Sequence, residues 1–401
     1  MLASAPRDSK PAPRIVPALI AMSALQALVA CAIFAPGVMA PRIGIAPATL
    51  GAYATAACVV AFFFTFAGGK FAGRYGSFRV ASFCAVIVFA TMGIAAWSGA
   101  SPWLAIAGVV LGLAYGPETP ASSTILFRIT PPAKRPLVFS LRQTGNQSGG
   151  IIGSLALPCL AAIDPLYGYV AIMLLAVLAL GAFELLRPRY DPLVRGTGSG
   201  VALRDALRIL ATNAAMRKLA IASLPFSALQ IALNVFLVSY GVTQLGLDLV
   251  QAGLLLAIAQ AGGLVGRLSF GLIASRFLPA WTTVVALGFG ISLCAGVVAL
   301  ATPGWSWALL LAVAFLFGVT ASGWNGVFLA EVARLSPEGR VGEATGAVLM
   351  FGFAGLVVGP LLMAGIAASS SLSVAYAALG LMTLLATLVL IRAPVKDSPP
   401  A

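Results

Sequence analysis

The sequence predicts an all-α membrane protein in which twelve transmembrane helices form two pseudo-symmetric six-helix bundles. Hydrophobic residues make up 60% of the 401 residues and charged residues only 9%, whereas a soluble fold carries about a quarter charged residues. Apolar stretches of about 20 residues recur along the chain, and each is long enough to cross a bilayer core of about 30 Å. The second half of the chain also repeats the first.

The repeat is visible in short identical or similar segments about half the chain apart. Residues 23–26 (SALQ) recur as 227–230, and residues 69–74 (GKFAGR) return as 271–276 (GLIASR). Internal repeats of this kind place the substrate site of many transporters at the interface between the repeated halves. We therefore expect a central site between the two bundles.

Twelve apolar segments define the expected helices. The first bundle comprises 15–40, 49–68, 78–97, 102–127, 137–163 and 166–186. The second comprises 219–242, 249–272, 281–302, 305–330, 342–367 and 372–391. The short connections between them require antiparallel neighbours. The expected domains are a disordered cytoplasmic tail, a bundle, a cytoplasmic loop, a second bundle and a second tail, over residues 1–14, 15–187, 188–217, 218–392 and 393–401.

Some segments carry signals about their internal geometry. Pro117 and Pro120 are expected to kink or break the fourth helix. Residues 201–210, with one apolar and one charged face, are expected to form a short helix at the membrane surface. Small residues let membrane helices approach closely, and glycine stripes mark the fifth and eleventh helices, at Gly145, Gly149, Gly150, Gly153, Gly352, Gly355 and Gly359.

The net charge of +13 is distributed in a way that excludes nucleic acid as the partner. Basic residues gather before residue 15 and at 70–79, 128–135, 187–218, 276, 334–340 and 392–396. All of these connections fall on one side of a chain that crosses the membrane twelve times. The positive-inside rule then places both termini in the cytoplasm. We expect a multi-pass protein of the bacterial inner membrane.

The sequence contains no histidine and only five cysteines. The cysteines lie in apolar segments without CxxC spacing, so we interpret them as small core residues. No HExxH, GxSxG, phosphate-binding loop or pair of intramembrane aspartates is present. We therefore expect no enzyme activity, no catalytic residue, no metal and no cofactor.

The connection between the second and third segments reads GKFAGRYGSFR over residues 69–79. It resembles the pattern G-x-L-x-D-R-x-G-R-R of the major facilitator superfamily. Gly69, Arg74, Gly76 and Arg79 match, and Gly73 stands where the family has an acid. The resemblance implies alternating access by a monomer and a gating role for Gly69, Arg74 and Arg79. The second copy, with Arg267 and Arg276, implies the same role and also lacks the acid; the missing acid implies a weaker cytoplasmic latch.

A finer resemblance links residues 115–123 (YGPETPASS) and 138–145 (VFSLRQTG) to bacterial cyanate and monocarboxylate permeases. In those relatives position 118 is commonly apolar and position 142 commonly basic. The fifth segment also fits, in part, a glycine pattern of drug antiporters, although the proline of that pattern is missing.

Among the ionisable residues within the expected spans, two stand out, Glu118 and Arg142. A charge there costs about 2.5–3.5 kcal/mol at the helix centre. Arg142 is suited to hold a carboxylate in two parallel hydrogen bonds. Glu118 is the candidate for taking up and releasing the coupling proton. Two alternatives stay open for Arg142: it reaches the headgroups, or it pairs permanently with Glu118.

Uncharged candidates for substrate binding share helix faces with these residues or occupy repeated positions. Gln26 and Gln230 are equivalent in the two halves. Arg267 is expected to be a structural gate that pairs with Glu331. The remaining candidates are Gln143, Asn146, Asn234, Trp324 and Asn325.

Together these features predict a secondary transporter that moves a small, monocarboxylate-like organic anion by alternating access, coupled to protons. The alternative is a proton-coupled efflux antiporter of drug-like or amphipathic compounds. The expected partners are the anionic substrate, the proton and the lipid bilayer.

Overall fold

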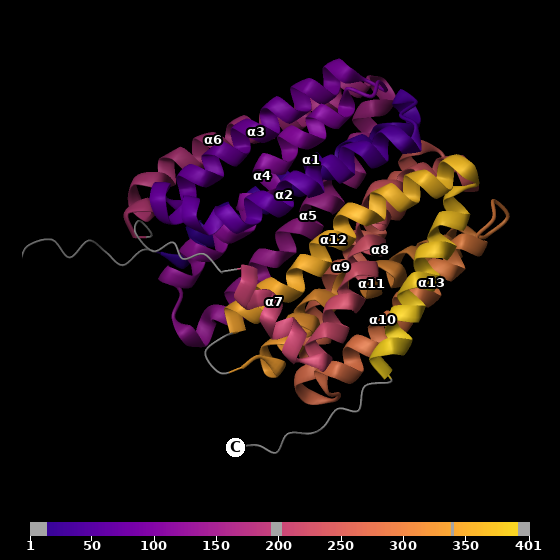
Figure 1. Ribbon diagram of the computed structural model, residues 1–401. Coiled ribbons are helices and arrows are strands. Elements are labelled where there is room, and N and C mark those ends of the chain that lie inside the picture. The colour runs from indigo at the N-terminus through magenta and orange to yellow at the C-terminus, as the bar shows by residue number, and fades with distance from the viewer. Residues whose placement is uncertain (1–13, 194–202, 338–340, 392–401) are drawn as a thin grey trace, which may run out of the picture.

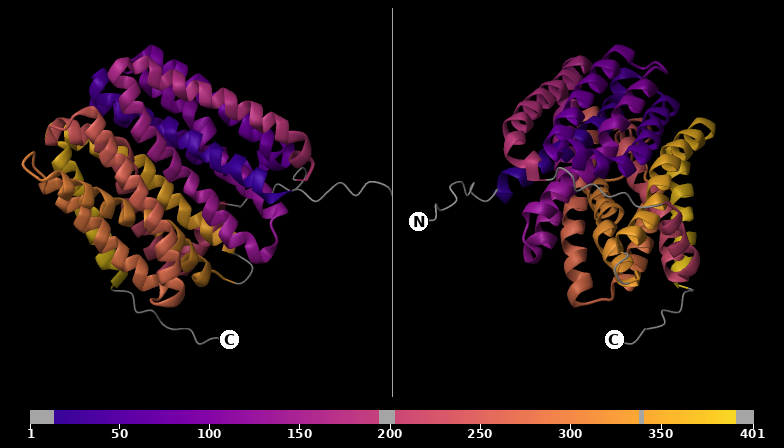
Figure 2. Two further views of the ribbon diagram at one scale, coloured as in Figure 1. Left: turned by 180° about the vertical axis from the view of Figure 1, so that it is seen from behind. Right: turned by 60° about the vertical axis from the view of Figure 1, so that its left-hand side comes forward.

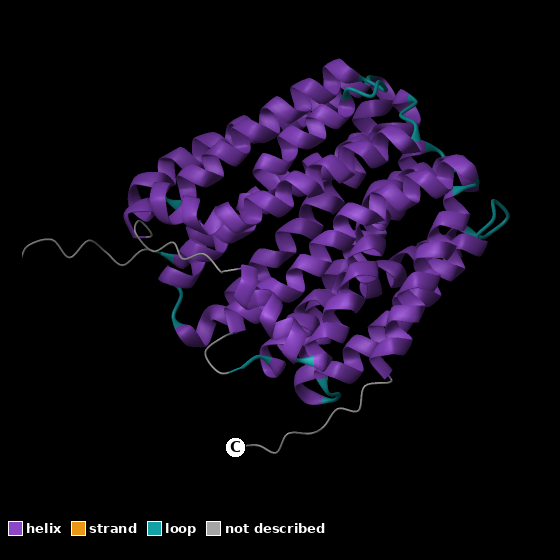
Figure 3. Ribbon diagram, in the orientation of Figure 1, coloured by secondary structure: helices purple, strands orange, loops and turns teal. Residues whose placement is uncertain are grey.

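The computed structural model describes residues 14–193, 203–337 and 341–391, and every regular element within these ranges is helical (Figure 3). The first half contains α1 (Ile15–Ile43), α2 (Pro47–Tyr75), α3 (Ser77–Ser98), α4 (Leu104–Ile129), α5 (Arg135–Ile163) and α6 (Pro165–Tyr190), with short 3-10 turns η1 (Pro132–Lys134) and η2 (Asp191–Leu193). The second half contains α7 (Leu203–Thr212), α8 (Ala214–Leu245), α9 (Leu249–Arg276), α10 (Ala280–Leu300), α11 (Trp307–Leu335), α12 (Val341–Ser369) and α13 (Leu372–Ile391).

The long helices form two bundles, α1–α6 and α8–α13, which lie side by side (Figures 1 and 2). The bundles are built alike. In the first, α2 packs on α4, α1 on α5 and α3 on α6; in the second, α9 packs on α11, α8 on α12 and α10 on α13. The predicted fold of two pseudo-symmetric six-helix bundles is confirmed.

Eleven described helices are long and apolar enough to span a membrane. The exception among the expected spans is α5, because it carries Arg135, Arg142 and several amide side chains. It packs between α1 of its own bundle and α9 of the other. Protein therefore surrounds its polar face, and lipid does not need to accommodate it.

The fourth helix is not broken by its two prolines: α4 runs without interruption from Leu104 to Ile129. Pro120 has no N–H to offer the carbonyl of Gly116, four residues earlier. The hydroxyl of Thr65 on α2 donates to that carbonyl instead, at 3.2 Å. A neighbouring helix thus satisfies the carbonyl that the proline leaves free.

Between the bundles, the expected short helix within 201–210 is present as α7, which packs against α12 and α8. The side chain of Asn213 then accepts from the N–H of Met216 and donates to the carbonyl of Leu335. It thereby caps α8 and holds it to the end of α11. Nearly all of both predicted tails, and part of the loop, lie outside the described residues.

The cysteines are only partly in the core. Cys31, Cys58 and Cys84 are buried, Cys294 is half-buried and Cys159 is exposed on α5. The expectation of five core cysteines is therefore wrong for Cys159. A small apolar thiol is equally at ease against lipid, so its sequence context does not distinguish the two positions.

The glycine stripes lie where α5 packs on α1 and α12 packs on α8, except that Gly150 faces Gln260 of α9. A Cβ on Gly149 would lie 2.7 Å from Cα of Ala27, and one on Gly355 would lie 3.0 Å from Cα of Leu224. These are backbone atoms that cannot swing aside. The close approach of each helix pair therefore requires glycine.

A leucine at Gly355 is expected to push α12 away from α8 and to lower the yield and thermal stability of the folded protein strongly. Gly365→Leu on the same helix is the matched control, because a Cβ there meets nothing within 4 Å. The measurement is the melting temperature of purified protein in detergent. Equal melting temperatures for the two variants would contradict this account of the α8–α12 packing.

The bundles meet through α1 with α8, α2 with α12, and α5 with α9. Close contacts lie in the halves of these helices away from residues 14 and 391, the side that we call distal. There Gly51 packs against Pro360 and Ala364, and Gly253 packs against Ser154 and Pro158. The bundles are therefore in tight contact on the distal side, beyond the central site described next.

Candidate functional site

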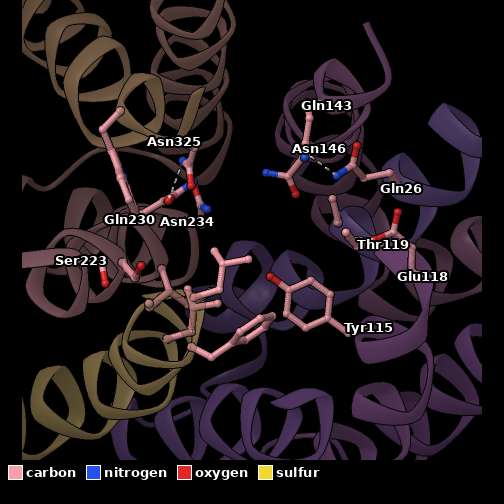
Figure 4. Close-up of a pocket in the computed structure, with 18 of the residues that line it drawn as sticks. Gln26, Tyr115, Glu118, Thr119, Gln143, Asn146, Ser223, Gln230, Asn234 and Asn325 are labelled. Carbon is pink, nitrogen blue, oxygen red and sulfur yellow. Dashed lines mark hydrogen bonds between the residues drawn. The ribbon is translucent and has the colours of Figure 1, made fainter. Parts of the chain in front are cut away.

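A cavity of about 180 Å³ lies between the bundles. Its walls come from α1, α4 and α5 of the first bundle and from α8, α9, α11 and α12 of the second. Most of the residues predicted for substrate or proton binding line it, namely Gln26, Glu118, Gln143, Asn146, Gln230, Asn234, Trp324 and Asn325. All of these except Trp324 are labelled in Figure 4. Arg142 does not line the cavity, whereas Arg267, predicted as a gate, does.

The two repeated glutamines stand on opposite walls of this cavity (Figure 4). Gln26 Nε2 donates to Gln143 Oε1 at 3.2 Å in the first bundle. Gln230 Oε1 accepts from Asn325 Nδ2 at 3.3 Å in the second. Each glutamine is thus held by a second amide of its own bundle. The repeat in sequence has become a pair of facing amide clusters.

A hydrogen bond from Gln260, which lies behind the cavity wall, orients the side chain of Asn234. Its Oδ1 accepts from Gln260 Nε2 at 2.7 Å, and both side chains are buried. This bond leaves the Nδ2 group of Asn234 free to donate to a bound solute, as one of several donors in the lining.

Glu118 and Arg142 form a buried ion pair between α4 and α5. Their side chains are 3% and 1% exposed. The hydroxyl of Thr119 donates to Glu118 Oε2 at 2.7 Å and accepts from Arg142 Nη2 at 3.2 Å. Arg142 Nε has no partner among the described residues. Arg142 is therefore bound to Glu118 in this state, one of the alternatives that the sequence left open.

Arg267 extends from α9 into the cavity wall and has only neutral hydrogen-bond partners there. Its Nε donates to the carbonyl of Ser322 at 3.1 Å, and its Nη1 donates to the carbonyl and Oε1 of Gln143 at 3.3 and 3.4 Å. With its amide oxygen turned toward Arg267, Gln147 accepts from Nε and Nη2 at 3.3 and 3.2 Å. These contacts join α9 of the second bundle to α5 of the first.

The sequence led us to expect that Glu331 pairs with Arg267, and this expectation is wrong. The carboxylate of Glu331 pairs with Arg334 at 2.6 Å instead. Arg334 is three residues further along α11 and therefore lies on the same helix face. Arg267 is held at the cavity by acceptors from α5 and α11, and no carboxylate of the described residues pairs with it.

Sequence reasoning missed Tyr115 as a member of the site. Its side chain lines the cavity and its hydroxyl points inward (Figure 4). Tyr115 precedes Glu118 by three residues and therefore shares its helix face. That spacing is the signal by which the sequence would have revealed it. Among the described residues, no group of three acidic, histidine or cysteine side chains could hold a metal ion.

Two six-helix bundles around a polar central cavity agree with the match of residues 18–330 to the sequence pattern of the Major Facilitator Superfamily. The chain belongs to this superfamily. It is therefore a transporter and a multi-pass membrane protein. A search among curated proteins gave no significant match.

Solved structures of other superfamily transporters share this fold. The nucleoside transporter NupG is 17% identical with a TM-score of 0.76, covering 93% of this chain and 98% of that one. A bacterial homolog of the human lysosomal transporter Spinster, inward-facing and occupied, is 18% identical with a TM-score of 0.73, covering 98% and 100%. A D-xylose-proton symporter is 15% identical with a TM-score of 0.72, covering 96% and 99%. At these identities the likeness shows the fold alone.

The superfamily motif lies at the turn between α2 and α3, with Gly69 and Arg74 on α2 and Arg79 on α3; Arg276 ends α9. A buried carboxylate does reach this turn, from Asp191 after α6. It accepts from the N–H groups of Phe78 and Arg79 at 2.7 and 3.1 Å. Asp191 therefore caps α3, although position 73 of the motif is glycine. The gating roles of these residues stay predictions.

Proposed function

We propose that this superfamily member carries a small organic anion, monocarboxylate-like, together with a proton. The observation that supports an anion is the charge of the cavity lining. Glu118 and Arg267 are the charged residues of the described lining. Glu118 is already neutralised by Arg142 from behind. Arg267, which has neutral partners, leaves the site with one excess positive charge.

The rest of the lining fits the two ends of a carboxylate. Arg267, Asn146 and the Tyr115 hydroxyl offer donors to carboxylate oxygens. On α12, the side chains of Leu349, Phe353 and Leu356 form an apolar wall for a short hydrocarbon portion. A cavity of about 180 Å³ suits a small solute, since drug-sized ligands occupy pockets of about 300–1,000 Å³.

The ion pair supplies a physical reason for coupling the anion to a proton. Protonation of Glu118 removes the negative charge that faces Arg142. A buried charge without a partner is strongly destabilising, and Arg142 is 0% exposed. An anion in the adjacent cavity restores the balance. Proton and anion are therefore favoured together, which is the signature of symport.

The distal contacts between the bundles indicate the side to which the cavity opens, if the basic side is cytoplasmic. The bundles are in tight contact on the distal side, through Gly51 with Ala364 and through Gly253 with Pro158. Tight contact on the distal side is the arrangement required of an inward-facing state. The opposite state requires these glycine contacts to separate and the α2–α3 turn to approach α12.

Glu118→Gln is expected to abolish accumulation of anion driven by a pH gradient while preserving exchange of anion for anion. Glutamine keeps the shape of a protonated carboxyl group but does not release a proton. The measurement is uptake into proteoliposomes, with acidic and neutral external buffers, of short carboxylates, cyanate and aromatic acids.

Glu118→Gln leaves Arg142 without its counter-charge. If that single variant does not fold, the double variant Glu118→Gln/Arg142→Gln, which removes both charges, is measured in its place. Uptake that still responds to the pH gradient in both variants would remove Glu118 from the coupling mechanism. If the wild-type protein takes up none of the anions tested, the proposed substrate class is wrong.

An efflux antiporter of amphipathic compounds is the second candidate, because aromatic side chains of the second bundle, Trp324, Phe328 and Phe353, also line the cavity. Cationic drugs in the same panel separate the two proposals. Thermal stabilisation by cations alone, unaffected by Arg267→Gln, would favour efflux over anion symport.

A further inference from the structure

A second cavity lies away from the central site, in the wedge where α2 and α3 diverge from their shared turn. This groove has a volume of about 280 Å³ and is lined by Phe64, Phe71, Tyr75, Arg79, Val80, Phe83 and Pro117. Pro117 of α4 forms its floor. We propose that this groove binds an anionic phospholipid of the surrounding leaflet, with an acyl chain between the aromatic rings and the phosphate on Arg79.

The walls of the groove suit a hydrocarbon chain. Phe64, Phe71 and Tyr75 form a continuous row along α2, with successive ring centroids 6.4 Å apart. Phe83 faces them from α3 and is 49% exposed, and Tyr75 is 42% exposed. In a chain of this superfamily, rings exposed at such positions meet lipid rather than water. The row from Phe64 to the turn at Gly76 covers about 18 Å of helix at 1.5 Å per residue.

The mouth of the groove suits a phosphate. Arg79 is the charged residue of the lining and lies at the start of α3, three residues after the turn at Gly76. Basic residues at the end of a membrane span reach the headgroups. No carboxylate of the described residues pairs with its side chain. Asp191, the nearby acid, is buried and accepts from the N–H groups of Phe78 and Arg79. Arg74, which lies over the ring of Tyr75 at 5.3 Å, adds a second positive charge beside the mouth.

Charge complementarity therefore favours an anionic headgroup over a zwitterionic one. A basic residue near the membrane surface strengthens the binding of anionic lipid by about 1 kcal/mol, or about fivefold. The apolar walls hold the chain whichever headgroup it carries, so Arg79 decides the preference among lipids.

The test is native mass spectrometry of the purified full-length protein after equilibration with vesicles of equal parts phosphatidylglycerol and phosphatidylethanolamine. The wild-type protein is expected to retain phosphatidylglycerol preferentially, and Arg79→Gln to lose that preference by about fivefold. Arg187→Gln is the matched control, because Arg187 is a partly exposed arginine that already pairs with Glu184.

A second variant, Phe83→Ala, tests the acyl-chain wall and is expected to reduce retention of both lipids. Melting temperatures of the variants show that each is folded. Equal retention of the two lipids by the wild-type protein, or unchanged phosphatidylglycerol retention in Arg79→Gln, would overturn the proposal. Neither result bears on the substrate of the central cavity.

Discussion

Arg267→Gln is expected to weaken binding of the transported anion by about 10- to 100-fold. A hydrogen bond to a charged group contributes about 1.5–3 kcal/mol, and each 1.4 kcal/mol is a factor of ten in affinity. The guanidinium of Arg267 is bound only to neutral oxygens of Ser322, Gln143 and Gln147. A carboxylate that enters the cavity is a stronger acceptor than any of them.

The measurement is stabilisation of the purified protein against heat by increasing concentrations of carboxylate. Arg128→Gln is the control, because Arg128 is exposed in the last turn of α4 and does not line the cavity. Arg267→Lys should bind with intermediate affinity, since an ammonium keeps the charge but lacks the planar pair of donors.

A result that spares binding in Arg267→Gln but abolishes it in Arg142→Gln would reverse this assignment. Arg142 would then be the anion ligand, as the sequence alone predicted, and Arg267 the residue that joins α9 to α5. Assigning the anion to Arg267 and assigning it to Arg142 therefore predict opposite results for the same titration with carboxylate.

Removing one member of the Glu118–Arg142 pair is expected to destabilise the protein by about 3–5 kcal/mol. The remaining charge is buried, and Arg142 Nε already lacks a partner. Removing both charges in Glu118→Gln/Arg142→Gln is expected to restore much of the loss, because two neutral side chains can share a hydrogen bond without an uncompensated charge.

Unfolding of the single and double variants in a denaturing detergent series gives the coupling energy of the pair. Arg187→Gln provides the surface reference: its pair with Glu184 is 39% exposed on both sides, and such pairs contribute about 0–1 kcal/mol. Additive losses in the double variant would show that the two residues do not depend on each other.

The fold was predictable because its signals are local and repeated. Hydrophobic length identifies each span, and the repeated segment of Gln26 and Gln230 identifies the two halves before any contact is known. Gly149 and Gly355 also predicted close helix crossings, and they do pack directly against the backbone of Ala27 and Leu224. The membrane makes these signals strong, since an unbonded backbone or a stray charge in lipid is costly.

The candidate site was predictable in its composition but not in its pairing. Gln26, Gln143, Asn146, Asn234 and Asn325 were expected at the cavity because polar groups within spans face one another rather than lipid, and they lie there. The partners of the charged residues depend on distances between helices that no spacing along the chain encodes. For this reason the sequence predicted an ion pair between Arg267 and Glu331, whereas Glu331 pairs with Arg334 on its own helix.

The sequence by itself determined the class of protein, the duplication of its helices, and the presence of Glu118, Arg142 and Arg267 on apolar segments that also carry amide side chains. Only the tertiary structure decided which arginine the acid neutralises. Arg142 and Glu118 meet because α4 and α5 bring them together, and Arg267 therefore lines the cavity with its charge unmatched. Electrostatic balance is set by the few ångströms between neighbouring helices, and those distances exist only once the bundles have packed.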